Sequence, residues 1–290
     1  MRVPQRVNMV VDAAGNRAAA NGYHNDDRPA DPLGSWAQRY VLVSLASGPA
    51  TGGTEIPAVS FFQPQQSPPV EPSRWTLIQA NGQTVPPGDK PCLVGGRTIQ
   101  TAQGPRLELH VTYASDDDLY YLRSTDGGAS WKLYTIPGAS NVSDMSFVTA
   151  AQNGTLYVSY LRDDWTWRFV RIQVTDPASD QIAVTHLANS DGFPLTLAPT
   201  APASVGGAIP LPGFINSHSF ALVPIALKPS DPNNEFYLCY HDVVDPNPPA
   251  EKDVNVYFHR VTRNPATDRW TLGTKQKVHS GEPLPSENVT

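Results

Sequence analysis

The stretch Ser124-Thr125-Asp126-Gly127-Gly128-Ala129-Ser130-Trp131 ends one alternating apolar segment and begins another. Residues 119–123 precede it and residues 131–136 follow it, and both have the period of two that predicts a β-strand. An Asp side chain accepts backbone N–H groups of its own turn, glycines adopt positive φ, and a Trp covers the turn with apolar surface. The stretch therefore predicts a β-hairpin whose structural residues are Ser124, Asp126, Gly128 and Trp131.

The strands around this turn belong to a repeat. One set of predicted strands ends on a tyrosine, at residues 107–113, 156–160 and 236–240. Each is followed by a polar loop and by a strand that ends on an arginine, namely Arg123, Arg171 or Arg260. A third strand then follows at residues 131–133, 182–184 and 270–272. Repetition of this kind predicts one supersecondary unit used several times.

The spacing of the arginines gives the size of the unit. Arg123 and Arg171 are 48 positions apart, close to a propeller blade of about 40–50 residues. Arg171 and Arg260 are 89 positions apart, which predicts one blade plus an insertion. Residues 188–217 are rich in Ala, Pro and Gly without periodicity, so we expect a long surface loop there. Innermost strands are predicted at residues 145–148 and 219–223.

The pattern S-x-D-x-G-x-x-W resembles the Asp-box of sialidase-like, BNR-repeat β-propellers, and residues 264–270 resemble a reduced copy that keeps Trp270. The resemblance implies an all-β fold, a β-propeller of four-stranded antiparallel blades, with four to six blades in a single domain over residues 1–290. Regular blades are expected at about 98–136, 144–187 and 218–278. Residues 1–95 are less regular, with strands expected at 40–45, 56–63 and 75–79.

Composition excludes several classes of partner. The 290 residues include 29 Pro and 21 Gly, which suits many short strands better than helices. The net charge of −6, without a Lys/Arg cluster, argues against nucleic acid and anionic membranes as partners. No apolar run reaches the roughly 20 residues of a membrane span. Cys92 and Cys239 are expected to be two buried free thiols rather than a disulfide.

The N-terminal residues bear on where the protein is located. The first 30 residues lack the order of a secretory signal. Removal of a leader, export by another route and an intracellular protein all stay open, and the expectation we carry forward is an extracellular or secreted protein. The sequence does not indicate an oligomeric state.

The resemblance also implies where ligands bind. In Asp-box propellers this is the face opposite the Asp-boxes, which carries the loop after the second strand of each blade and the links between blades. Four such loops here present carboxylates, three of them beside an aromatic residue or a histidine. The predicted ligand-binding residues are Tyr23, His24, Asp26, Asp116, Arg162, Asp163, Asp164, Trp165, His241 and Asp242. Ordinary turn chemistry of Asp and Ser is the competing explanation.

The sequence argues against sialidase activity itself. The Arg-Ile-Pro motif that the resemblance implies is absent, and Glu55-Ile56-Pro57 is the nearest string. We expect Arg123, Arg171 and Arg260 to pair within their own blades rather than with a ligand. An acidic ligand face would also repel an anionic sugar.

Three functions follow from these residues. Carbohydrate recognition without catalysis, as in a lectin or adhesin, leads because carboxylates accept sugar hydroxyls and aromatic faces stack on sugars. A glycoside hydrolase is the alternative, with catalytic carboxylates from the set Asp12, Asp26, Glu108, Asp144 and Asp242. The third is a scaffold that presents residues 188–217 to a protein partner. No cofactor is predicted, and at Asp116–Asp118 a solvated loop is favoured over a Ca²⁺ site.

Overall fold

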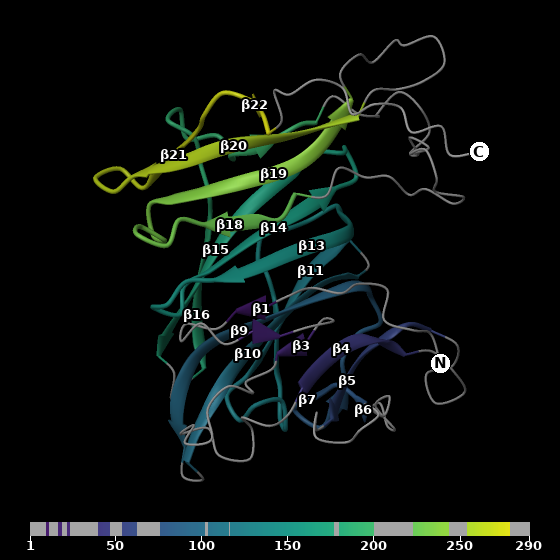
Figure 1. Ribbon diagram of the computed structural model, residues 1–290. Helices are drawn as coiled ribbons and strands as arrows, with labels where there is room; N and C mark the ends of the chain where they lie inside the picture. Colours follow the sequence, from purple (N-terminus) through teal and green to yellow (C-terminus); the bar gives the residue numbers. More distant parts are fainter. Residues whose placement is uncertain are drawn as a thin grey trace, which may run out of the picture.

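The computed structural model describes residues 10–11, 17–18, 22–23, 40–46, 54–62, 76–101, 104–115, 117–176, 180–199, 223–243 and 254–278. The regular structure of these residues is entirely β (Figure 1). Among them, no helix is long and apolar enough to cross a membrane.

Four sheets form the framework, two of four strands and two of five, and the main path of each takes four strands in chain order. Blade 1 contains β3 (Gly22–Tyr23), β4 (Tyr40–Ala46), β5 (Ile56–Phe62) and β6 (Thr76–Leu77). Blade 2 contains β9 (Asp89–Thr101), β10 (Gly104–Ser115), β11 (Asp118–Ser124) and β12 (Lys132–Thr135). Blade 3 contains β13 (Val142–Ala150), β14 (Leu156–Arg162), β15 (Trp167–Asp176) and β16 (Gln181–His186). Blade 4 contains β18 (Ile225–Leu227), β19 (Glu235–Val243), β20 (Val254–Asn264) and β21 (Arg269–Leu272).

Short strands extend or flank this framework. β17 (Thr196–Leu197) pairs with β15, and β22 (Gln276–Lys277) pairs with β20. Two small hairpins lie outside the blades, formed by β1 (Val10–Val11) with β2 (Arg17–Ala18) and by β7 (Gln79–Ala80) with β8 (Gln83–Thr84).

The sheets follow one another across the molecule in chain order (Figure 1). β4 contacts β9, β13 contacts both β9 and β10, and β18 contacts both β13 and β14. Consecutive antiparallel meanders that pack face to face through their first strands are the blades of a β-propeller. The predicted fold class is therefore confirmed, with four blades in the part of the chain that the structure describes.

The repeat read from the sequence matches the second, third and fourth strands of blades 2 to 4. The first strands of the blades differ more from the prediction. Blade 2 begins at Asp89, whereas the sequence predicted a start near residue 98. The prediction missed the earlier start because Gly95 and Gly96 interrupt the alternation within β9. The first described strand of blade 4 is β18 (225–227), and of the predicted inner strand at 219–223 only Val223 lies in the described part of the chain. Blade 1 carries a further repeat, since Arg74-Trp75-Thr76-Leu77 recurs as Arg269-Trp270-Thr271-Leu272.

The predicted surface loop at 188–217 is partly wrong. Thr196 and Leu197 form β17 on the edge of β15, and the side chains of Leu195 and Leu197 are buried. Two leucines at alternate positions give this segment an apolar face, which explains why it joins the sheet. Residues 200–217 lie outside the described part of the chain.

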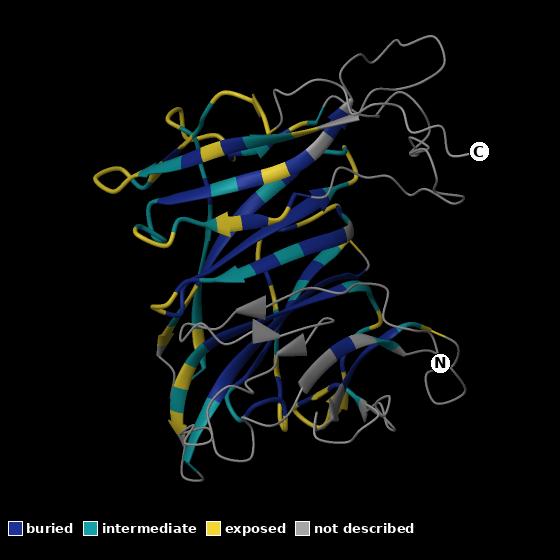
Figure 2. Ribbon diagram, in the orientation of Figure 1, coloured by how far each residue is buried: buried dark blue, intermediate teal, exposed yellow. Residues whose placement is uncertain are grey.

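The core lies between the facing sheets (Figure 2). One apolar cluster is centred on blade 2 and includes Tyr113, Tyr121 and Trp131, and a second joins blades 3 and 4 through Trp167 and Trp270. These tryptophans are buried, as the repeat predicts. Cys92 is buried and forms no disulfide, as expected, but Cys239 is exposed because it faces outward from β19.

The turn between β11 and β12 has the predicted chemistry. The backbone N–H of Ser130 donates to Asp126 Oδ1 (2.9 Å), and that of Gly128 donates to Ser124 Oγ (2.7 Å). Gly127 and Gly128 have φ values of 74° and 97°. The Trp131 indole N–H donates to the Gly128 carbonyl (3.0 Å), so the ring folds back over the turn. Side chain and backbone together fix this hairpin.

The three repeat arginines differ in their pairing. Arg123 pairs with Glu108 Oε1 of its own blade (2.6 Å) and also with Asp180 Oδ1 of blade 3 (2.7 Å). Arg171 reaches only the next blade, where both oxygens of Asp268 accept its guanidinium (3.1 and 2.8 Å). Arg260 pairs within blade 4, with Glu235 Oε2 (2.6 Å). The expectation of pairing within one blade is therefore wrong for Arg171, whose blade has Thr155 where blades 2 and 4 have Glu108 and Glu235.

Asp180 and Asp268 occupy equivalent hairpin turns, and both have positive φ, 56° and 54°. A left-handed residue at this turn position points its carboxylate back at the preceding blade. These contacts connect blade 2 to blade 3 and blade 3 to blade 4 at the rim that carries the Asp126 turn.

A buried polar cluster in blade 2 makes stability depend on pH. His110 is fully buried, its Nδ1 hydrogen-bonds to the Tyr121 hydroxyl (2.8 Å), and its Nε2 lies 3.7 Å from Glu108 Oε2. Burial lowers the pKa of His110 to about 4, although the charge of Glu108 opposes this shift. Between about pH 6.5 and pH 4 the unfolded chain therefore binds a proton that the folded chain excludes, so stability falls as the pH falls.

We expect this histidine alone to remove about 2 kcal/mol of stability between pH 7 and pH 5. Denaturant unfolding of the wild type and of His110→Gln at both pH values measures the effect. Glutamine does not titrate, so the variant should lose less stability than the wild type on acidification. Equal losses in the two proteins would show that His110 is not responsible.

Candidate functional site

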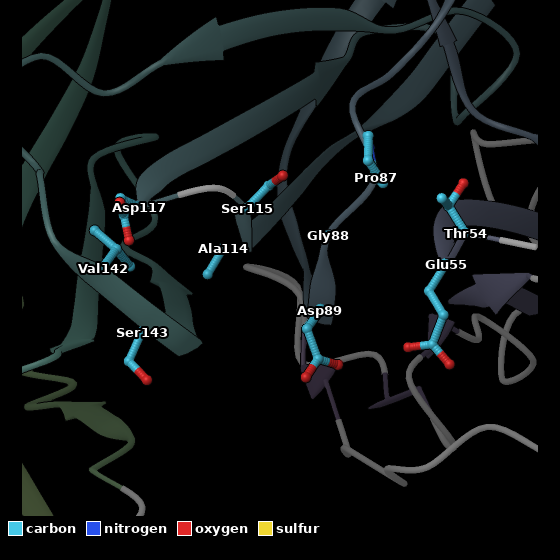
Figure 3. A pocket seen from close by; sticks show the side chains of 10 residues that line it. All are labelled: Thr54, Glu55, Pro87, Gly88, Asp89, Ala114, Ser115, Asp117, Val142 and Ser143. Carbon is cyan, nitrogen blue, oxygen red and sulfur yellow. The ribbon is translucent and has the colours of Figure 1, made fainter.

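A cleft of about 470 Å³ opens at the junction of blades 1, 2 and 3. Its lining comes from the start of β5, the link into β9, the β10–β11 loop and the start of β13 (Figure 3). The lining residues are Thr54, Glu55, Pro87, Gly88, Asp89, Ala114, Ser115, Asp117, Val142 and Ser143. The cleft and the Asp126 turn lie at opposite ends of β11, because Asp117 precedes that strand and the turn follows it.

Close backbone packing shapes the cleft. The Gly88 N–H donates to the Glu55 carbonyl (2.9 Å), and the Val142 N–H donates to the Asp117 carbonyl (3.0 Å). A Cβ at Gly88 would lie 2.4 Å from Cδ2 of Tyr113 and 2.6 Å from the Ala114 carbonyl oxygen, so only glycine fits. These contacts tie the two blade links to the loops of blades 1 and 2.

The lining is acidic and rich in hydroxyl groups. Figure 3 shows Glu55 and Asp89 on one side of the cleft, with Asp117 and Ser143 on the other. Asp89 also accepts the N–H of Lys90 (2.7 Å) and pairs with the Lys90 ammonium. Among the described residues, no Lys, Arg or aromatic side chain is part of the lining. Carboxylates in such a lining accept hydrogen bonds from the hydroxyls of a neutral polyol and repel anions.

Two of the predicted loops lie side by side on this rim. The Asp117 carbonyl accepts the N–H of Val142, and the Asn141 carbonyl accepts the N–H of Asp163 (3.0 Å), so one link touches both loops. Asp163 is exposed beside the cleft. Asp164 caps its own turn, because its Oδ1 accepts the backbone N–H (3.1 Å) and the hydroxyl (2.6 Å) of Thr166. Trp165 has a φ of 61° and packs partly buried against the core of blades 3 and 4 rather than over the cleft.

The remaining predicted residues contribute differently. Asp242 is fully buried and accepts a hydrogen bond from Lys275 Nζ (2.6 Å). Its role in binding a ligand stays a prediction, and the proposal below does not depend on it. His241 lies beside it on β19, and Tyr23 pairs with Val41 through its backbone. His24, Asp26 and Asp116 lie outside the described residues.

The carboxylates considered for hydrolysis are largely occupied or outside the described part. Glu108 is fully buried and is held by Arg97 (3.1 Å) and Arg123 (2.6 Å). Asp12 and Asp26 fall outside the described residues, and the side chain of Asp144 does also. Within the described part no three His, Cys, Asp or Glu residues are grouped as metal ligands.

None of the predicted ligand-binding residues is among the described residues that line the cleft. Sequence reasoning missed all three carboxylates, Glu55, Asp89 and Asp117, although it selected Asp116 in the same loop as Asp117. Asp89 could have been predicted as a site residue, because the links between blades lie on the expected ligand face and Asp89 is at the end of such a link. Finding it required the start of β9, which the sequence pattern did not reveal. Glu55 lies in a loop of blade 1 with no periodic marker.

A scan of protein-family models finds no match, and a search of curated proteins finds no relative. Among solved structures, a mutant of Aleuria aurantia lectin in complex with α-methyl-L-fucoside is 12% identical over 84% of this chain and 58% of that chain, with a TM-score of 0.44. The same lectin in complex with Fucα1-6GlcNAc is 12% identical over 97% of each chain, with a TM-score of 0.40. NanB sialidase from Streptococcus pneumoniae is 11% identical over 94% of this chain and 40% of that chain, with a TM-score of 0.38. At these TM-scores the likeness carries no functional inference for this chain.

Proposed function

We propose that this chain is a carbohydrate-binding β-propeller of the Asp-box, BNR-repeat kind, which recognises a neutral sugar without transforming it. The cleft between blades 1, 2 and 3 carries the proposal, because its described lining combines three carboxylates and three hydroxyls with no cationic side chain. Its volume of about 470 Å³ lies within the range of about 300–1,000 Å³ typical of ligand pockets. It also lies at the rim where the resemblance implies ligands bind.

A glycoside hydrolase is the second candidate, and one observation favours it. Glu55 and Asp89 lie across the cleft from Asp117 (Figure 3), and hydrolysis needs two carboxyl groups that flank the scissile bond, about 5–9.5 Å apart. The third candidate is a protein-binding scaffold. Phe193, which is 68% exposed in the segment before β17, is the apolar residue that such a partner would contact first.

A glycan array probed with the purified protein, together with fluorogenic glycosides on the same sample, separates the three functions. The proposal predicts saturable binding to neutral glycans without turnover. Turnover that disappears in both Glu55→Gln and Asp89→Asn would establish the hydrolase instead. Silence in both assays would contradict carbohydrate recognition and favour the scaffold.

A further inference from the structure

A second pocket, of about 210 Å³, has the opposite charge to the cleft. It lies on blade 3, between the end of β14, the start of β15 and the segment that leads into β17. Tyr160, Arg162, Arg168, His186 and Leu195 line it, and no carboxylate is among the described residues of its lining.

The two arginines come together through strand pairing. Tyr160 and Arg168 are cross-strand partners in the β14–β15 ladder, and Arg162 closes the same hairpin by donating its N–H to the Thr166 carbonyl (2.9 Å). Burial raises the pKa of the Tyr160 hydroxyl, and the charges of Arg168 and Arg162 oppose that shift. The charges of both guanidinium groups therefore counteract the rise that burial causes in the pKa of the Tyr160 hydroxyl at the side of the pocket.

Arg162 and Arg168 lack the close carboxylate partners that the repeat arginines Arg123 and Arg171 have. Arg123 and Arg171 each pair closely with a carboxylate, at 2.6 and 2.8 Å. Arg168 bonds only to neutral oxygens, the Pro194 carbonyl (3.3 Å) and the Thr196 hydroxyl, and no described carboxylate lies within ion-pair distance of it. Arg162 forms only a long ion pair among the described residues, with Asp164 Oδ2 at 3.8 Å. In the described part of the chain, the Nε atoms of both arginines are buried without a hydrogen-bond partner.

The walls of this pocket are fixed in advance. β17 holds Arg168 through Thr196 and Pro194, and His186 Nε2 hydrogen-bonds to the Pro137 carbonyl (2.7 Å). Gly138 has a φ of 76°, and a Cβ there would lie 3.0 Å from His186 Nε2, so the link passes close over the imidazole. The pocket is therefore a rigid, partly desolvated site for a charged group. In such a site a guanidinium binds oxyanions more strongly than it does in water.

We propose that the pocket formed by Tyr160, Arg162, Arg168 and His186 binds an oxyanion group, a carboxylate or a sulfate. The group belongs either to a free ion or to an acidic sugar residue, and the chemistry of recognition is the same for both. This site does not depend on the cleft, whose carboxylates exclude the same ligands.

Calorimetric titration at constant ionic strength tests the proposal, with sodium sulfate, sodium acetate and methyl β-D-glucuronide as the probes. We expect saturable binding of at least one probe to the wild type and a loss of affinity of at least about tenfold in Arg168→Gln, because the variant loses the charge-assisted hydrogen bonds of the guanidinium. Arg106→Gln is the matched control, since Arg106 lies on β10 and bonds only to the Pro105 carbonyl, and it should bind like the wild type.

Arg162→Gln provides a second variant if Arg168→Gln unfolds, which a melting curve reports. Tighter binding of the glucuronide than of acetate would assign the site to an acidic sugar, and equal binding would assign it to a free anion. Absence of saturable binding to the wild type, or equal affinity in the wild type and in folded Arg168→Gln and Arg162→Gln, would overturn the proposal. Because neutral glycans are not used, failure here leaves the function proposed for the cleft intact.

Discussion

Replacing Glu108 with glutamine should lower the free energy of unfolding by about 3–5 kcal/mol, the usual cost of breaking a buried ion pair from one side. Glu108 has no exposed surface, and it accepts Arg123 through one carboxylate oxygen and Arg97 through the other. The amide keeps the shape of the side chain but removes its charge, so the buried guanidinium of Arg123 keeps only Asp180 as a carboxylate partner. Chemical denaturation at pH 7 measures the difference.

Glu235→Gln is the matched control for this prediction. Glu235 occupies the equivalent position in blade 4, but its partners Arg260 and Lys228 have side chains that are 55% and 34% exposed. Hydrogen bonds from Arg260 and Lys228 lower the pKa of Glu235 to about 2, yet both cations return to water when the carboxylate is lost. We expect a clearly smaller loss than for Glu108→Gln. Equal losses would show that burial of the partner does not determine the cost.

Trp131→Ala should cost on the order of 3 kcal/mol, because it empties a packed aromatic site. The indole is buried in the core of blade 2, and it also donates the hydrogen bond that fixes Gly128 in the turn. The substitution lies at the opposite end of β11 from the cleft, so the affinity of the folded fraction for a glycan should not change. Thermal unfolding and a glycan titration below the melting temperature measure the two effects separately.

Trp165→Ala is the comparison for Trp131→Ala. Trp165 is only partly buried and lies in a turn, so its removal should cost less stability. The sequence predicts weaker glycan binding by this variant, whereas binding in the cleft requires an unchanged affinity, because Trp165 is not among the described residues that line it. Equal stability losses from the two variants would contradict the difference in burial between the two tryptophans.

The Asp126 turn and the repeat of strands were accessible from the sequence because both depend on local chemistry. A turn with Asp, two glycines and Trp satisfies its own backbone groups, and alternation marks strands with one buried face. β9 was cut short in the prediction because Gly95 and Gly96 break the alternation, although Gly95 still pairs with Leu109 of β10 and the strand continues past a register shift at Gly96. β18 has only three residues, too few for a periodic pattern.

Contacts between blades were beyond sequence reasoning for a different reason. Asp180 and Asp268 look like ordinary turn residues, and only the packing of blades brings each carboxylate to an arginine of the preceding blade. The cleft is similar, since Glu55, Asp89 and Asp117 come from separate elements of blades 1 and 2. Loop 115–118 was nevertheless predicted to face ligand, because its place after a second strand follows from the repeat alone.

The affinity of the strongest array glycan for the wild type and for Asp117→Asn tests the central claim most directly. Asp117 is exposed in the cleft, so the variant should fold normally and bind about 10–100-fold more weakly, as expected for loss of a charge-assisted hydrogen bond. Asp191→Asn, at an exposed aspartate outside the cleft, should bind like the wild type. Unchanged affinity in Asp117→Asn, Asp89→Asn and Glu55→Gln alike would show that the glycan binds elsewhere on the propeller.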